Sequence, residues 1–298
     1  MAMEPQRLMR AATIASMSVA VVLIGAKTAA WLITESVSML SSLVDSSLDF
    51  LASLITFLAV RQALTPADAD HRFGHGKAEA LAGLTQAGFI AASGGGLLLT
   101  VGDRLLHPHE VRDEAVGVAV SLLAIALTLA LVAFQNYVVK RTGSIAIGAD
   151  KAHYKTDLVS NVAVGIALFL AGRFNQPLID AGMAALVALY LMHGAWGVGR
   201  GSLDVLMDRE LPDVDRLRIV DIARRHPEVQ DIHDLRTRSS GLTKFIQLHI
   251  ELDPTLTLTR AHEIGDQVEA DIQAAFPDAE IILHVDPFGV EERRIGFT

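Results

Sequence analysis

Six stretches of this chain are apolar over about the 20 residues that a helix needs to cross a bilayer. They lie at 8–34, 36–64, 78–105, 115–139, 145–171 and 178–203. Lipid offers no hydrogen-bond partner to a peptide group, so a spanning segment must satisfy its own backbone, as an α-helix does. With 51% hydrophobic residues and a mean hydropathy of +0.38, the sequence predicts a transmembrane domain of six helices over residues 1–207.

The composition changes after Leu206. From Asp208 to the C-terminus there are 11 basic and 19 acidic residues, a net charge of −8 out of −9 for the whole chain. The residue pattern predicts helix, strand, strand, helix and strand at 213–225, 229–238, 243–252, 258–276 and 279–285. This order predicts a small α+β domain over 208–298, ferredoxin-like or metallochaperone-like. Because no basic face is present, nucleic acid is excluded as a partner.

Basic residues gather at one set of segment ends. Only three lie at the opposite ends: Arg104, Arg112 and Arg173. Nine lie at the richer ends: Arg7, Arg10, Arg61, Arg72, Lys77, Lys140, Arg141, Lys151 and Lys155. The positive-inside rule therefore predicts that both termini are cytoplasmic, which an even number of spans requires.

Two carboxylates interrupt the second apolar stretch. Asp45 and Asp49 are four residues apart, so they share one helix face at roughly 6 Å. A charged side chain at membrane depth costs about 2.5–3.5 kcal/mol on insertion scales. Two like charges on one face cost more unless a cation or protons lie between them. The pair therefore predicts a cation site completed by another segment.

The fifth stretch offers a second pair at the same spacing, His153 and Asp157. Three carboxylates and one imidazole form a four-ligand cage that suits Zn²⁺, with Fe²⁺, Cd²⁺ or Co²⁺ as alternatives. Thiolate ligation is excluded because the chain has no cysteine. One such pair alone would be read as a contact between helices; two matched pairs favour a metal site.

All four candidate ligands also titrate. They must be deprotonated to bind metal, so protons compete with the cation for the same cage. A cage that takes metal from one side and protons from the other would couple the two fluxes. His153 is the best candidate proton carrier at neutral pH.

A polar loop follows the second stretch. Asp68, His71 and His75 can hold a metal there with one position left to water. Asp70 is an equally available ligand, and an ordinary solvated loop is the alternative reading. The sequence leaves these choices open.

Histidines are enriched in the C-terminal domain. The candidates are His233, His249, His262, His284 and Asp286. Alternation along a strand places His284 and Asp286 on one sheet face, with His233 and His249 on neighbouring strands. This cluster predicts a regulatory or structural metal site.

Taken together, these motifs resemble the cation diffusion facilitator family. The resemblance rests on Asp45-x-x-x-Asp49 paired with His153-x-x-x-Asp157. The six spans, the loop sequence ending in Lys77, and the small α+β domain ending in His284-Val-Asp286-Pro add to it. The resemblance covers essentially the whole chain, and the chain is most similar to bacterial zinc and iron efflux transporters.

The resemblance implies a homodimeric antiporter in the bacterial inner membrane that exports Zn²⁺, with Fe²⁺ or Cd²⁺ as alternatives, in exchange for protons. It implies a transport site at Asp45, Asp49, His153 and Asp157. It implies a loop site at Asp68, His71 and His75, and a binuclear site at His233, His249, His262, His284 and a bridging Asp286. It also implies an interlock of Lys77 with Asp208 near the dimer interface.

Two other classes are weighed against transport. A metalloenzyme would need an activated water beside a general base, and the sequence contains no His-Glu-x-x-His helix to provide one. A membrane metal sensor would keep every cluster but move no ion. We therefore expect a secondary transporter and no enzyme activity.

Overall fold

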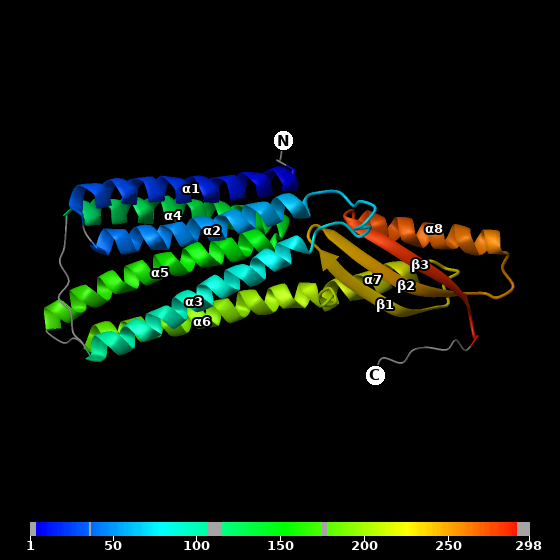
Figure 1. Ribbon diagram of the computed structural model, residues 1–298. Coiled ribbons are helices and arrows are strands. Elements are labelled where there is room, and N and C mark those ends of the chain that lie inside the picture. The colour runs from blue at the N-terminus through cyan, green and yellow to red at the C-terminus, as the bar shows by residue number, and fades with distance from the viewer. Residues whose placement is uncertain (1–3, 36, 107–114, 175–177, 291–298) are drawn as a thin grey trace. The chain divides into compact units, whose positions relative to one another are not determined.

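The chain divides into two compact units, here called the membrane unit (Met1–Leu206) and the C-terminal unit (Met207–Thr298). The computed structural model describes residues 4–35, 37–106, 115–174 and 178–290 (Figure 1). Ser36, at the start of the second apolar stretch, and Arg112 lie outside the described residues. Each unit has a hydrophobic core of its own.

Within the described residues, the membrane unit consists of six long helices, one for each predicted span (Figure 1). Their lengths of 27 to 30 residues correspond to about 40 Å or more, enough to cross a hydrocarbon core of about 30 Å with some tilt. The prediction of a helical membrane domain is therefore confirmed. The helices are α1 (Pro5–Thr34), α2 (Val37–Ala63), α3 (Ala78–Leu106), α4 (Ala115–Thr142), α5 (Ile145–Phe174) and α6 (Leu178–Leu206).

The helices differ in how apolar they are. Five of them contain, within the described residues, a window long and apolar enough to span a membrane. The remaining helix, α5, carries four charged residues over little more than two turns: Asp150, Lys151, Lys155 and Asp157. Large apolar side chains elsewhere, such as Leu99 and Trp196, are 78% and 70% exposed and suit contact with lipid. Polar chemistry in this unit is therefore concentrated around α5.

Small residues let α3 and α6 pack closely. In the described part of the chain, the contact of α3 with α6 is the most extensive between any two elements. A Cβ added to Gly83 would lie 2.3 Å from Ser202 Oγ, and one added to Gly94 would lie 3.2 Å from Leu191 Cβ. Close approach at small residues is a usual basis of helix association in lipid, where no hydrophobic driving force acts between helices.

The C-terminal unit has the predicted order of helix, strand, strand, helix and strand. β1 pairs antiparallel with β2, and β2 pairs parallel with β3, in a sheet of order β1-β2-β3. The parallel pair needs a crossover, which α8 provides. The predicted α+β fold is therefore confirmed. The elements are α7 (Asp213–Arg224), β1 (Asp231–Ser240), β2 (Thr243–Leu252), α8 (Leu258–Ala275) and β3 (Ala279–Pro287).

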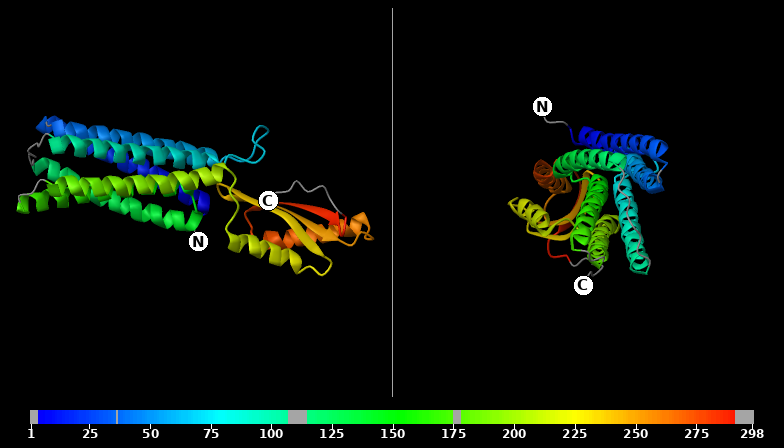
Figure 2. Two further views of the ribbon diagram at one scale, coloured as in Figure 1. Left: turned by 90° about the horizontal axis from the view of Figure 1, so that it is seen from below. Right: turned by 90° about the vertical axis from the view of Figure 1, so that its left-hand side faces the viewer.

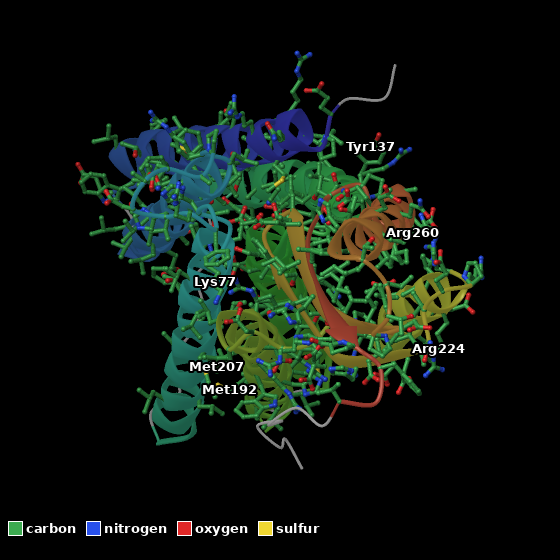
Figure 3. All side chains as sticks on the ribbon, turned by 90° about the vertical axis from the view of Figure 1, so that its right-hand side faces the viewer. Lys77, Tyr137, Met192, Met207, Arg224 and Arg260 are labelled. Carbon is green, nitrogen blue, oxygen red and sulfur yellow. The ribbon has the colours of Figure 1, made fainter. Side chains whose placement is uncertain are left out.

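One face of this sheet carries the core. Figure 3 shows α7, which carries Arg224, and α8, which carries Arg260, on the same side of the strands; Figure 2 shows the same layering from other directions. Because side chains alternate along a strand, the odd-numbered residues of β2, His249 among them, lie on the opposite face. Four alternating residues of β2 are buried in the core with residues of α7 and α8: Ile246, Leu248, Ile250 and Leu252.

The contact of α3 with α6 gives a stability prediction. Gly83→Leu should lower the thermal unfolding midpoint of the detergent-solubilised protein by several degrees, because overpacking costs about 1–3 kcal/mol. Gly88→Leu is the matched control in the same helix, since nothing lies within 4 Å of a Cβ at Gly88. Equal midpoints for the two variants would contradict close packing at Gly83.

Candidate metal centres

The first group of candidate ligands lies inside the membrane unit. His153 Nε2 is 3.2 Å from Asp49 Oδ1 on α2 and 3.5 Å from Asp157 Oδ2 one turn further along α5. His153 is buried and the two carboxylates are half-buried. Among the described residues, His153 Nδ1 and Asp157 Oδ2 have no hydrogen-bond partner. One imidazole and two carboxylates thus converge on one point, with ligand atoms within 4.8 Å of one another.

Asp45 stands apart from this group. It lies one turn before Asp49 on α2, its side chain is exposed, and the group of converging ligand atoms does not include it. Its role as a fourth ligand stays a prediction. The stretch of α2 next to Asp45 is contacted by a lysine of α1. Lys27 donates hydrogen bonds to Ser46 Oγ at 2.6 Å and to the Ser42 carbonyl at 3.1 Å.

A buried carboxylate holds α5 in place one turn before His153. Asp150 is 1% exposed. It accepts three hydrogen bonds, from Ser16 Oγ on α1 at 2.7 Å, Gln135 Nε2 on α4 at 2.7 Å and Gln86 Nε2 on α3 at 3.4 Å. Buried carboxylates need such donors, because an unpaired charge in a low-dielectric interior is costly. The network therefore fixes the segment of α5 that carries the histidine.

The second group lies in the loop between α2 and α3. His71 Nδ1 is 3.3 Å from Asp68 Oδ1, and His75 Nε2 is 3.4 Å from Asp68 Oδ2. The two imidazole rings are tilted, with centroids 4.6 Å apart. His71 and Asp68 are exposed, whereas the His75 side chain is only 7% exposed. All three predicted residues converge, and Asp70 is not part of the group.

The backbone prepares Asp68 to bind a cation. The amide of His71 donates to its Oδ1 at 2.7 Å, and the amide of Asp70 donates at 3.0 Å. The hydrogen bond from the His71 backbone is the main cause that lowers the pKa of Asp68 below its usual value. Asp70 thus supports the carboxylate through its backbone, while its own side chain is exposed.

The third group lies on the sheet of the C-terminal unit. Strand register pairs His233 with His249 across β1 and β2, and His249 with His284 across β2 and β3. Directly paired residues share a face, so the three imidazoles form a row on the face opposite α7 and α8. Ring centroids are 5.1 Å apart for the first pair and 4.8 Å for the second.

Asp286 lies at the centre of this row. Its Oδ2 is 2.8 Å from His249 Nδ1 and 3.3 Å from His233 Nε2, while its Oδ1 is 3.0 Å from His284 Nε2. The carboxylate is buried, and each of its oxygens faces a different part of the row. Such a carboxylate has the donor arrangement that a bridging ligand between two ions requires.

One predicted ligand of this site lies elsewhere. His262 is exposed on α8 and its Nε2 is 3.6 Å from Asp266 Oδ2, four residues along the same helix. The converging ligand atoms are those of His233, His249 and Asp286, a group that includes neither His262 nor His284, and the role of His262 stays a prediction. The structure adds Glu251 instead, whose Oε1 is 3.0 Å from His233 Nδ1.

The two residues of the predicted interlock belong to different units. Lys77 belongs to the membrane unit, where its ammonium group donates to the Leu206 carbonyl at 3.4 Å. Asp208 belongs to the C-terminal unit and pairs with Arg238, with 3.3 Å between Oδ1 and the guanidinium Nη1. A pairing of Lys77 with Asp208 stays a prediction.

Comparison with known proteins places the chain in a family. Residues 13–207 match the cation efflux transmembrane domain, and residues 211–288 match the cytoplasmic domain of cation efflux proteins. The chain belongs to the cation diffusion facilitator family. Like other cation efflux transporters, it exports divalent metal across a membrane and is not an enzyme.

Individual relatives extend this match over nearly the whole chain. The cation-efflux pump FieF of Shewanella oneidensis is 48% identical over 277 residues, which cover 93% of each protein. That of Serratia proteamaculans is 44% identical over 290 residues, covering 97% of this chain and 96% of the relative. The solved metal-bound C-terminal domain of the CzcD transporter from Thermotoga maritima is 28% identical, with a TM-score of 0.26, over 27% of this chain and 95% of that one.

Three residues near the candidate sites were missed by sequence reasoning. Lys27 is a lone lysine inside an apolar stretch, and Asp150 precedes His153 by one helical turn; both signals were visible. Glu251 gives no such signal, because its nearness to His233 depends on strand register. A charge inside an apolar segment predicts a partner on another segment, because an unpaired charge at membrane depth is costly.

The row of histidines gives a metal-binding prediction. Excess Zn²⁺ should raise the unfolding midpoint of the full-length protein, because a ligand at about 100 times its Kd stabilises by about 2.7 kcal/mol. Asp286→Asn should reduce this rise and the bound zinc per chain, with the exposed Asp278→Asn as control. The same rise in both variants would show that zinc does not bind through Asp286.

The loop between α2 and α3 gives a second metal-binding prediction, which tests whether Asp68 or Asp70 is the ligand. Asp68→Ala should lower the zinc bound per chain in equilibrium dialysis, because the Asp68 carboxylate contacts both imidazoles. Asp70→Ala removes a neighbouring carboxylate and leaves its backbone amide, so zinc binding should persist. A loss with Asp70→Ala and none with Asp68→Ala would make Asp70 the ligand.

Proposed function

We propose that this transporter exchanges Zn²⁺ for protons at one intramembrane site formed by Asp45, Asp49, His153 and Asp157. The observation that carries the proposal is the approach of His153 Nε2 to carboxylates of two helices at 3.2 and 3.5 Å. Those atoms lie on α2 and α5 of the membrane unit, and an ionisable residue at membrane depth is by default a candidate functional residue. Asp45 completes the site by a change of side-chain rotamer.

The donor set favours zinc as the ion carried. One imidazole nitrogen and carboxylate oxygens provide the mixed N and O ligation that Zn²⁺ accepts in tetrahedral geometry. Fe²⁺ and Cd²⁺ are alternatives, because such a set discriminates weakly among divalent transition metals. The sequence contains no thiolate to shift the preference toward softer ions.

Proton coupling follows from the same residues. Asp49 and Asp157 cannot both be ionised beside each other at low cost unless a positive charge lies between them. A bound divalent ion supplies that charge in one state, and protons on the carboxylates and on His153 supply it in the other. Alternating access then exchanges one for the other, with the pH gradient drawing metal out of the cytoplasm.

We further propose that the C-terminal unit is cytoplasmic, binds two zinc ions and joins two chains into a homodimer. The match of residues 211–288 to a cytoplasmic domain supports the location, and the family model is named ZT_dimer. His233, His249, His284 and Asp286 form the ligands. Asp68, His71 and His75 of the loop form a further zinc site. Both termini are then cytoplasmic, in a protein of the bacterial inner membrane.

Flux measurements in proteoliposomes test this function. Zn²⁺ entry, followed with an internal dye, should increase with an imposed pH gradient and fall at least about a hundredfold in Asp157→Ala and Asp49→Ala. Asp204→Asn, an acid of α6 outside the three ligand groups, is the matched control and should retain flux.

The possible failures have different meanings. Flux that ignores the gradient would exclude antiport and indicate a uniporter. Full flux in Asp157→Ala would place the transport site elsewhere. A folded protein that binds zinc and moves none would be a metal sensor.

A further inference from the structure

A lysine of the membrane unit lies beside the proposed transport site without being one of its ligands. Lys27 of α1 is half-buried and follows a segment that is apolar from Val21 to Ala26. Its ammonium group donates to Ser46 Oγ at 2.6 Å and to the Ser42 carbonyl at 3.1 Å. Both hydrogen bonds go to α2, and neither goes to a carboxylate.

Helical periodicity places this ammonium next to the site. Ser42, Ser46 and Asp49 follow each other at intervals of four and three residues, so they lie along one face of α2. Lys27 is therefore held about one helical turn from Asp49, and Asp45 precedes Ser46 directly. Asp49, Asp45 and Asp157, the three carboxylates of the site, all act electrostatically on the ammonium.

The formal charge of the site, with Lys27 included, matches a divalent ion. Three ionised carboxylates give −3, and the ammonium gives +1, so the site with neutral His153 has a formal charge of −2. A divalent ion neutralises this charge. Without the lysine the same ligands would carry −3, and a bound divalent ion would leave one negative charge uncompensated in a low-dielectric environment.

We propose that Lys27 is a built-in counter-charge that matches the transport site to a divalent ion and weakens its hold enough for release. This rests on the proposed function, because it takes the four ligands as the transport site. The lysine is a positioning and charge-setting residue, since its hydrogen bonds to Ser46 and Ser42 keep it off the ligand oxygens. Those oxygens remain available to metal.

Removing the charge of Lys27 should increase the affinity of the site for metal, whereas most substitutions near a binding site decrease it. The ammonium repels a divalent ion twice as strongly as it repels a single proton, so its loss tightens the binding of the metal. Even at the dielectric constant of water, about 80, and a separation of about one helical turn, this repulsion amounts to about tenfold in affinity. Tighter binding slows release, so the KM for Zn²⁺ and the maximum flux should fall together.

Proteoliposomes holding the full-length protein provide the test, with Zn²⁺ flux measured against Zn²⁺ concentration. Lys27→Gln keeps hydrogen-bond donors for Ser46 and removes the charge; its KM and its maximum flux should each fall about tenfold. Lys27→Met is a second neutral variant for which the same change is expected. Lys27→Arg restores the charge and should bring KM back toward that of the unmodified protein.

Thr28→Val is the matched control. Thr28 is next to Lys27 on α1, and its hydroxyl donates to the Ile24 carbonyl of its own helix at 2.8 Å. This variant should leave KM unchanged. A merely structural role for Lys27 would lower the maximum flux in the neutral variants without lowering KM.

An unchanged or higher KM in both neutral variants would overturn the proposal, as would failure of Lys27→Arg to restore it. Failure of the proposed function looks different. Flux that persists in Asp157→Ala, or that ignores the pH gradient in the unmodified protein, removes the site or the antiport without reference to Lys27.

Discussion

Ionised side chains are stable inside a bilayer only when another charge, a metal or hydrogen-bond donors face them. The membrane unit is arranged around this constraint. Its most charged helix, α5, is held by donors from α1, α3 and α4 at Asp150 and meets a carboxylate of α2 at His153. Apolar side chains such as Leu99 and Trp196 are exposed on the outside, where lipid can cover them.

The two carboxylates on α5 differ in their hydrogen bonding: Asp150 is fully bonded within the protein, whereas Asp157 has an oxygen without a donor. Asp150 accepts three hydrogen bonds and is buried, so its charge is compensated by the protein itself. Asp157 is two turns away, and its Oδ2 receives no hydrogen bond from the described residues. Because an oxygen of Asp157 is left without a donor, this carboxylate can exchange metal for protons. Asp150 holds α5 in place.

The C-terminal unit reaches a similar convergence by a different route. Strand pairing, not helix periodicity, brings His233, His249 and His284 into one row and places Asp286 among them. The apolar residues on the other face of β2 fix the register, because a slip of one residue would move the histidines into the core. Burial of that core therefore also determines the geometry of the metal ligands.

The sequence by itself determined the long apolar helices of the membrane unit, the order of elements in the C-terminal unit and the residue types available as ligands. These follow from hydrophobic runs and from periods of 3.6 and 2, which are local properties. Tertiary structure decided which residues meet. His262 shares the composition of the cluster but lies on α8 beside Asp266, and Glu251 reaches His233 only through strand pairing. Lys27 and Asp150 were visible as charges in apolar segments, but their partners on other helices were not. Contacts between distant segments depend on how helices pack and strands align, and a single sequence does not encode that in any local pattern.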